Sequence, residues 1–211
     1  MITLYTWTTP NGRKISIMLE ELGIPYEVKP VNLGKGEQLQ PDYLVISPNN
    51  KIPAIVDSDI PEGPVNIFES GAILIYLAEK HGRFLPATGA ARAQILEWLM
   101  WQMAGLGPMF GQANYFGVTE NGKNEAALQR YVKESERLLG VMDRQLEKNT
   151  YLASNEYSIA DIAAYPWVLS ATSYAKDILG DLVAARPHVQ RWLREVGARP
   201  AVQRGMNIPA L

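Results

Sequence analysis

The chain of 211 residues contains no cysteine, and its only histidines are His81 and His188. The absence of cysteine excludes disulfide bonds, cysteine-ligated metals and a thiol nucleophile of the protein's own. With two histidines, a histidine-rich metal site or a relay of several imidazoles is also excluded. Any chemistry must use hydroxyls, amides, carboxylates or a borrowed co-substrate, and we expect no bound metal.

Charge of one sign is also lacking. The 22 acidic and 20 basic residues leave a formal net charge of −2. A nucleic-acid-binding protein would carry a basic patch or stripe, so we expect no nucleic-acid partner. The N-terminus has neither the basic segment nor the long apolar run of a signal peptide. Together with the absence of cysteine, this predicts a cytoplasmic protein.

The segment Trp98–Thr119 contains no charged residue and is long enough to span a bilayer as a helix. It also contains Gln102, Gln112 and Asn114. These side chains favour a helix buried on most sides in an aqueous protein over a membrane span. We expect no membrane partner.

Composition changes near residue 86. Nine of the fourteen prolines lie at or before this position, and four of the five tryptophans follow it. Many short turns thus precede long helices, which predicts two domains. The expected division is a first domain over residues 1–82, a linker over 83–88 and an all-helical domain over 89–211.

Hydrophobic periodicity predicts the elements of the first domain. Two strands flank a helix, which makes a βαβ unit, and two further short strands and a helix follow. This βαβ-ββα order predicts an α/β domain with a thioredoxin-like sheet. The expected strands cover 2–7, 26–33, 54–57 and 65–68, and the expected helices cover 13–22 and 70–80.

The second domain is predicted to be all α. A long helix over 90–116 should bend at Gly105, Gly107 and Pro108, because proline removes a backbone hydrogen bond. Ser158, with Asp161 three residues later, predicts a capped helix start. Further helices are expected over 125–148 and 187–196, followed by a tail over 197–211.

Residues 8–12, Thr-Thr-Pro-Asn-Gly, lead from the first expected strand into the first helix. Unpaired N–H groups and about half a positive charge make a helix N-terminus a site for anions. Pro-Asn-Gly is equally good turn chemistry, so the residues alone leave both interpretations open.

Lys51-Ile52-Pro53 precedes the third expected strand. If the Ile52–Pro53 bond is cis, the Ile52 backbone can pair with an added peptide ligand. Alternatively, Pro53 only marks the edge of a strand.

Glu69 and Ser70 begin the second expected helix. The hydroxyl and the N–H groups suit a ligand carboxylate, and Glu69 suits a ligand ammonium. Ordinary helix capping explains the same residues without a ligand. The glycine-containing segment 33–38 is expected to be a surface loop.

Four segments together resemble the cytosolic glutathione transferases. They are Thr-Thr-Pro-Asn-Gly at 8–12, Ser-Pro-Asn-Asn-Lys-Ile-Pro-Ala-Ile-Val-Asp at 47–57, Phe-Glu-Ser-Gly-Ala-Ile-Leu at 68–74 and Tyr-Ser-Ile-Ala-Asp at 157–161. Trp101-Gln102, Gly107-Pro108-Met109 and Gly111-Gln112 resemble the bacterial nu-class branch, which includes glutathione-dependent disulfide-bond reductases. The resemblance covers essentially the whole chain, and it implies a homodimer with glutathione as co-substrate.

The resemblance also implies roles for individual residues. Thr9 and Asn11 would approach the sulfur of glutathione, with Tyr5 a weaker rival. The remaining implied contacts are the Ile52 backbone and cis-Pro53 with the cysteinyl part, Glu69 and Ser70 with the γ-glutamyl end, Lys51 and Gln38 toward the glycyl carboxylate, and Arg130 across the dimer interface.

The expected activity is glutathione-dependent disulfide reduction through a bound thiolate. Conjugation of glutathione to apolar electrophiles is the alternative, and a non-catalytic binding module is a third. Relatives in this branch often carry histidine just after the Gly-Gln pair, whereas this chain has Ala-Asn-Tyr-Phe at 113–116. This departure leaves the second substrate open.

Overall fold

The structure is a computed structural model that describes residues 1–210, so Leu211 of the expected tail and helical domain lies outside the described residues. The chain forms two compact units, one comprising Met1–Leu85 with residues 199–210 and the other Pro86–Ala198. The sequence analysis grouped residues 199–210 with the helical domain. In the structure they pack on the first unit, because helix α10 contacts helix α1.

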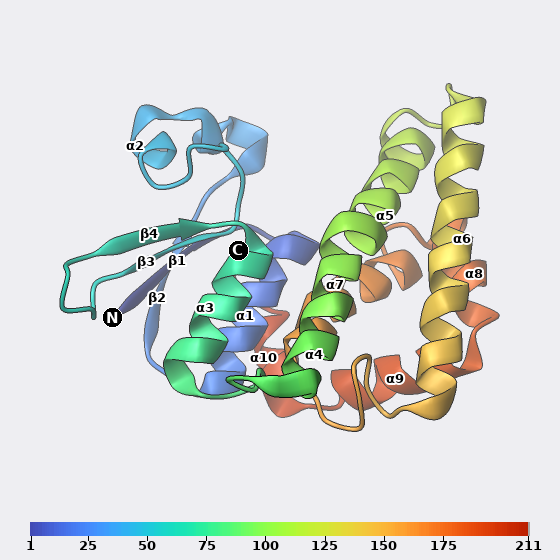
Figure 1. Ribbon diagram of the computed structural model, residues 1–211. Helices are drawn as coiled ribbons and strands as arrows, with labels where there is room; N and C mark the ends of the chain where they lie inside the picture. Colours follow the sequence, from blue (N-terminus) through green and yellow to red (C-terminus); the bar gives the residue numbers. More distant parts are fainter. Residues whose placement is uncertain (211) are drawn as a thin grey trace. The chain divides into compact units, whose positions relative to one another are not determined.

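The first unit is an α/β sandwich around a four-stranded sheet of order β2-β1-β3-β4. β1 pairs parallel with β2 and antiparallel with β3, which pairs antiparallel with β4. α1 and α3 contact each other and cover one face of the sheet (Figure 1). The elements are β1 (Ile2–Thr6), α1 (Pro10–Leu22), β2 (Tyr26–Pro30), α2 (Pro41–Leu44), β3 (Ala54–Asp57), β4 (Val65–Phe68), α3 (Ser70–His81) and α10 (Pro200–Gly205).

This arrangement confirms the expected thioredoxin-like βαβ-ββα order. The strands β3 and β4 have the expected bounds, and α1 begins three residues earlier than predicted, with Pro10 in its first turn. A proline is well placed there, since the first turn has no use for its missing N–H. The segment 33–38 does not remain an irregular loop, because it forms 3₁₀ turns over Leu33–Lys35 and Glu37–Leu39.

α10 packs closely on α1. The Ser16 hydroxyl donates a 2.6 Å hydrogen bond to the Gly205 carbonyl. A Cβ at position 205 would lie 2.5 Å from Ile17 Cα, so only glycine allows this approach. The guanidinium of Arg199, just before α10, pairs with the Glu21 carboxylate of α1 at 2.6 Å.

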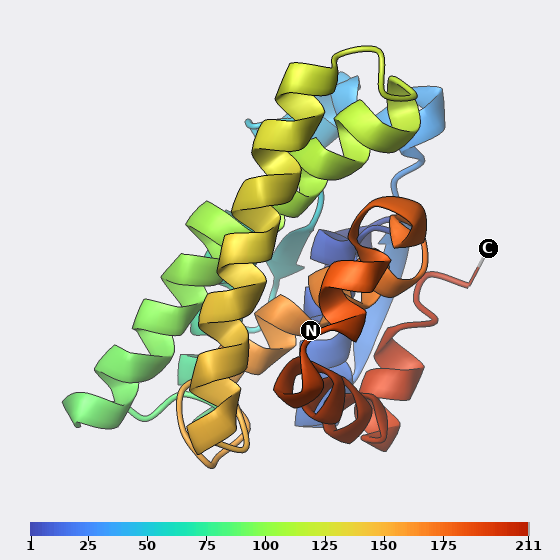
Figure 2. The ribbon, with the colours of Figure 1, turned by 90° about the vertical axis from the view of Figure 1, so that its right-hand side faces the viewer.

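The second unit is all helical. Its elements are α4 (Gly89–Trp101), η3 (Gln102–Leu106), α5 (Gly107–Asn114), η4 (Tyr115–Thr119), α6 (Glu125–Lys148), α7 (Ile159–Thr172), η5 (Lys176–Gly180), α8 (Asp181–Ala184) and α9 (Pro187–Gly197). α5 and α6 run side by side in both views (Figures 1 and 2). Among residues 1–210, every helix is too short or too polar to cross a bilayer.

Ser158 and Asp161 form the predicted capping box at the start of α7. The Asp161 carboxylate is buried and accepts hydrogen bonds from the Leu152 backbone and from Trp192 Nε1, both at 2.9 Å. The box therefore also ties α7 to α9 and to the loop before α7. Burial raises the pKa of Asp161 to about 6, although these hydrogen bonds act in the opposite direction.

The long uncharged segment differs from its prediction in two ways. Before Pro108 the helix widens into a π turn, in which the Gly107 N–H donates to the Gln102 carbonyl. The segment is also not buried on most sides. One stripe is buried, at Leu99, Gln102, Leu106, Phe110 and Ala113, whereas the opposite stripe is exposed, at Met100, Ala104, Pro108, Gln112 and Tyr115.

Candidate active site

The N-terminus of α1 follows β1 through a short turn. Thr9 is the N-cap, and its hydroxyl oxygen accepts a 3.2 Å hydrogen bond from the Gly12 N–H. A Cβ on Gly12 would lie 2.4 Å from both Thr6 Oγ1 and the Trp7 carbonyl oxygen. The glycine is thus required by close approach of the helix to the preceding turn. Asn11, half-buried, is the second residue of α1.

The Thr9 geometry leaves the hydroxyl able to donate. A hydroxyl that accepts from an amide still carries its own hydrogen, and acceptance from a backbone N–H strengthens that donation. An anion at this position would also interact favourably with the helix N-terminus. Both open interpretations of residues 8–12 therefore hold together, since Gly12 serves the turn and Thr9 can serve an anion.

Tyr5, the weaker rival, points elsewhere. Its ring centroid lies 6.1 Å from that of Tyr43, and the Lys29 ammonium lies 5.6 Å from the same ring. These contacts place the Tyr5 ring against other side chains of the first unit.

The Ile52–Pro53 peptide bond is cis, as the sequence analysis expected. Ile52 lies outside the strand pairing, since β3 begins at Ala54. The preceding carbonyl of Lys51 accepts hydrogen bonds from Tyr43 Oη at 2.7 Å and from Ser47 Oγ at 2.9 Å. This backbone is therefore held in place while the Lys51 side chain remains exposed.

Glu69 has a backbone φ of 70°, a left-handed conformation that is rare for a residue with a side chain. Although Glu69 is the N-cap of α3, its side chain makes no capping hydrogen bond. Its exposed carboxylate instead accepts from Asn49 Nδ2 at 3.3 Å. Ser70 follows as the first residue of α3 and is buried. Ordinary capping therefore does not account for Glu69.

Gln38 is partly buried, and its Oε1 is a buried atom without a hydrogen-bond partner among residues 1–210. An orphaned buried oxygen is costly unless something else satisfies it. A peptide ligand could do so. Together with Thr9 and Glu69, this atom shows that the side chains present suit a small peptide with both polar and charged ends.

Arg130 lies in the second unit, on α6, and its side chain is exposed. It lines a cavity of about 650 Å³ together with Met109, Tyr131, Lys133, Glu134 and Arg137. Three of these residues are cationic and one is acidic, so the cavity wall suits an anionic group.

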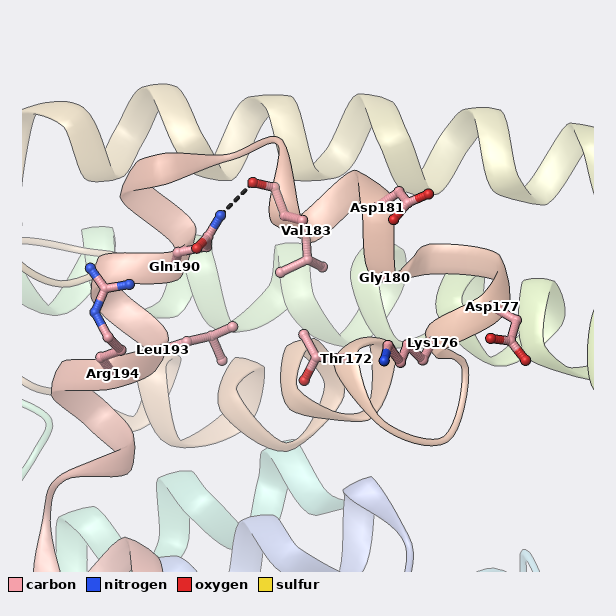
Figure 3. Close-up of a pocket in the computed structure, with 10 residues that line it drawn as sticks. Thr172, Lys176, Asp177, Gly180, Asp181, Val183, Gln190, Leu193 and Arg194 are labelled. Carbon is pink, nitrogen blue, oxygen red and sulfur yellow. Dashed lines mark hydrogen bonds between the residues drawn. The ribbon is translucent and has the colours of Figure 1, made fainter.

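Another cavity of the helical unit, of about 590 Å³, contains none of the predicted site residues. Val183 and Leu193 give it an apolar wall, and the Lys176 ammonium lies beside Thr172 (Figure 3). Across it, Gln190 Nε2 donates to the Ala184 carbonyl. In the described part of the chain, no group of three or more His, Cys, Asp or Glu side chains could hold a metal ion.

Lys14 is a residue of this region that the sequence analysis missed. Its side chain is only 1% exposed, and its ammonium donates a 3.2 Å hydrogen bond to Ser70 Oγ. The signal was available, since position 14 shares the i, i+4 stripe of Met18 and Leu22 on a helix with a buried face.

Two family profiles match the chain. Residues 1–79 match the Glutathione S-transferase, N-terminal domain, and residues 99–200 match the Glutathione S-transferase, C-terminal domain. With the thioredoxin-like unit and the helical unit described above, these matches show that the chain belongs to the glutathione S-transferase family. The predicted family and fold are thereby confirmed.

Within that family, the chain is 47% identical over 203 residues to Disulfide-bond oxidoreductase YfcG of Escherichia coli strain K12, covering 95% of this chain and 92% of that protein. It is also similar to solved structures. One is a glutathione transferase family member from Pseudomonas fluorescens pf-5 with two glutathione bound, at 46% identity and a TM-score of 0.94, covering 99% of this chain and 93% of that one. Another, a glutathione transferase from Pseudomonas putida with one glutathione disulfide bound per subunit, has 48% identity and a TM-score of 0.93, covering 99% of this chain and 91% of that one.

Proposed function

We propose that this protein is a glutathione-dependent disulfide reductase that works through a bound glutathione thiolate. The observation that carries the thiolate chemistry is the N-terminus of α1, where Thr9 caps the helix and keeps a hydroxyl hydrogen to donate. The choice of disulfides as substrates is supported by the relative named a disulfide-bond oxidoreductase and by the related structure with glutathione disulfide bound.

The proposed thiolate is stabilised by hydrogen bonds from Thr9 and Asn11. A thiol is a poor nucleophile until it ionises. A hydrogen bond to a charged group contributes about 1.5 to 3 kcal/mol, equivalent to about one or two pKa units. That is enough to populate the thiolate near neutral pH. The Ile52 backbone would hold the cysteinyl part, Glu69 and Ser70 the γ-glutamyl end, and Gln38 and Lys51 the glycyl carboxylate.

The reaction balances with two glutathione molecules. The first thiolate attacks one sulfur of the substrate disulfide, so that a mixed disulfide forms and a substrate thiolate leaves and takes up a proton. A second glutathione thiolate then attacks the glutathione sulfur of the mixed disulfide. Glutathione disulfide forms, and the second substrate thiol is released. The protein has no cysteine, so both thiols come from glutathione.

We also propose that the protein is a nu-class homodimer. The exposed stripe from Met100 to Tyr115 is uncharged, and Met100 and Tyr115 are 49% and 45% exposed. An uncharged helix face of this length is unusual on a surface that faces water. The first unit adds further exposed apolar side chains at Leu39, Leu44, Val45 and Phe68. A second copy of the chain would cover these surfaces.

Arg130 fits the dimer proposal as a residue that reaches glutathione in the partner subunit. Its exposed position beside Lys133 and Arg137 leaves its guanidinium accessible to an anion from outside its own chain. The compartment proposed for the protein is the cytoplasm, because glutathione is kept reduced there and the absence of cysteine suits a reducing environment.

The test of the proposed function is a pair of assays with purified protein and glutathione. Hydroxyethyl disulfide should be reduced much faster than chlorodinitrobenzene is conjugated. Thr9→Ala and Asn11→Ala should each lower disulfide turnover by about tenfold or more, because each removes one hydrogen bond to the thiolate.

Thr8→Ala is the matched control, since Thr8 is the exposed neighbour in the same turn, and it should leave turnover within about twofold. Thr9→Ser keeps the hydroxyl and should retain most activity. Faster turnover of the aryl chloride would instead favour the conjugating alternative. Glutathione binding without either activity would favour a binding module.

A further inference from the structure

Lys14 is a buried cation that the reaction proposed above does not use. It lies in the second turn of α1 among the buried residues Ile15, Ser16 and Ile17, and it is 1% exposed. Lysine is almost never fully buried, because transfer of an ammonium out of water is costly. Burial accordingly lowers the pKa of Lys14 to about 7, while the carboxylate of Glu69 acts in the opposite direction.

The contacts of Lys14 lead to one place in the first unit. Its ammonium donates to Ser70 Oγ at 3.2 Å, and Glu69 is the neighbouring residue. Ser70 is itself 3% exposed, whereas the Glu69 carboxylate is exposed. A single buried cation thus bears on both side chains at the start of α3.

Stability does not explain a lysine at this position. An apolar side chain of similar volume would pack in the same space without the desolvation cost. Lys80 provides the contrast within the same unit. It pairs with the buried carboxylate of Asp57, is 24% exposed, and lies about ten residues from Ser70 along α3.

We propose that Lys14 is a positioning residue for the γ-glutamyl group of glutathione and acts through Ser70 and Glu69. This inference rests on the proposed function. Because the Ser70 oxygen accepts from Lys14, the hydroxyl hydrogen is directed away from the ammonium and can be donated to the α-carboxylate of the ligand. The buried positive charge also offsets the negative charge that this carboxylate brings beside Glu69.

The test compares two ligands whose thiol is blocked by a methyl group, so that thiol ionisation plays no part. One is S-methylglutathione, and the other is the same peptide with 4-aminobutyrate in place of glutamate, which lacks only the α-carboxylate. Calorimetry should show that Lys14→Met weakens binding of the first ligand by about tenfold and changes binding of the second by less than about twofold.

Kinetics give a second measurement on the same variant. With hydroxyethyl disulfide as substrate, the KM for glutathione should rise by about tenfold, while kcat at saturating glutathione stays within about twofold. Lys80→Met is the matched control. It should lower the melting temperature and leave the ratio of the two affinities unchanged.

Equal weakening of both ligands, or of neither, would overturn the role of Lys14. A wild-type protein that binds neither ligand overturns the proposed function itself, so the two failures are distinguishable. If Lys14→Met does not fold, Lys14→Gln decides the matter by the same affinity ratio, because its amide keeps a polar end in the buried position.

Discussion

At the residue scale, the pKa of Lys14 couples the stability of the fold to pH. The folded value of about 7 lies below the ordinary 10.5 because the side chain is buried. Between these two values the unfolded chain binds more protons than the folded chain. The free energy of unfolding that this group affects is therefore highest above about pH 10.5 and falls as the pH is lowered to about 7.

Lys14→Met removes this dependence. We expect the variant to gain stability relative to the wild type as the pH falls from about 9 to about 7, since only the wild type must bury a charge. Urea denaturation across that range measures the difference. Lys123→Met, a change of an exposed lysine, serves as the control and should track the wild type. Parallel curves for Lys14→Met and the wild type would contradict the expectation.

At the element scale, α10 is held on α1 by a contact that only glycine permits. Position 205 has no room for a methyl group, because the added atom would meet the backbone of Ile17. Gly205→Ala should therefore lower the free energy of unfolding by about 1 to 3 kcal/mol through overpacking.

Gly140→Ala is the matched change on α6. Its added methyl group would meet only the end of the flexible Arg144 side chain, at 3.5 Å. We expect this variant to gain about 0.5 to 1 kcal/mol, because alanine is the better helix former. Chemical denaturation of both variants tests the pair, and equal effects of the same sign would show that α10 does not pack tightly on α1.

At the scale of the whole molecule, the exposed uncharged stripe of α4 and α5 makes the proposed dimer testable. Ala104→Glu places a charge in the middle of this stripe, where burial against a second copy would leave it unpaired. Light scattering should show a monomer. Because Arg130 is proposed to serve the partner subunit, the same variant should bind glutathione more weakly.

Ala184→Glu is the control for the dimer, since it introduces the same charge at an exposed alanine of α8 outside the stripe. It should leave both the molecular mass and the glutathione affinity unchanged. A dimeric Ala104→Glu protein with wild-type affinity would remove α4 and α5 from the proposed interface.

The sequence by itself determined the features that depend on neighbours close along the chain. Hydrophobic period and turn residues placed β3, β4 and α6, and the spacing of Ser158 and Asp161 predicted the start of α7. Short motifs were enough to recognise the family. These features are local because helix caps, turns and side-chain periodicity involve residues only a few positions apart.

Only the tertiary structure decided the features that depend on distant segments. The periodicity of α1 does not show that Lys14 meets Ser70, which is 56 positions away, and the tail does not show that Gly205 lies against Ile17. The same holds for the exposed stripe around Ala104, because an uncharged helix face looks alike in sequence whether its own chain or another covers it. In each case the outcome is set by which surfaces pack together, and packing brings together residues whose separation in sequence is unrelated to their distance in space.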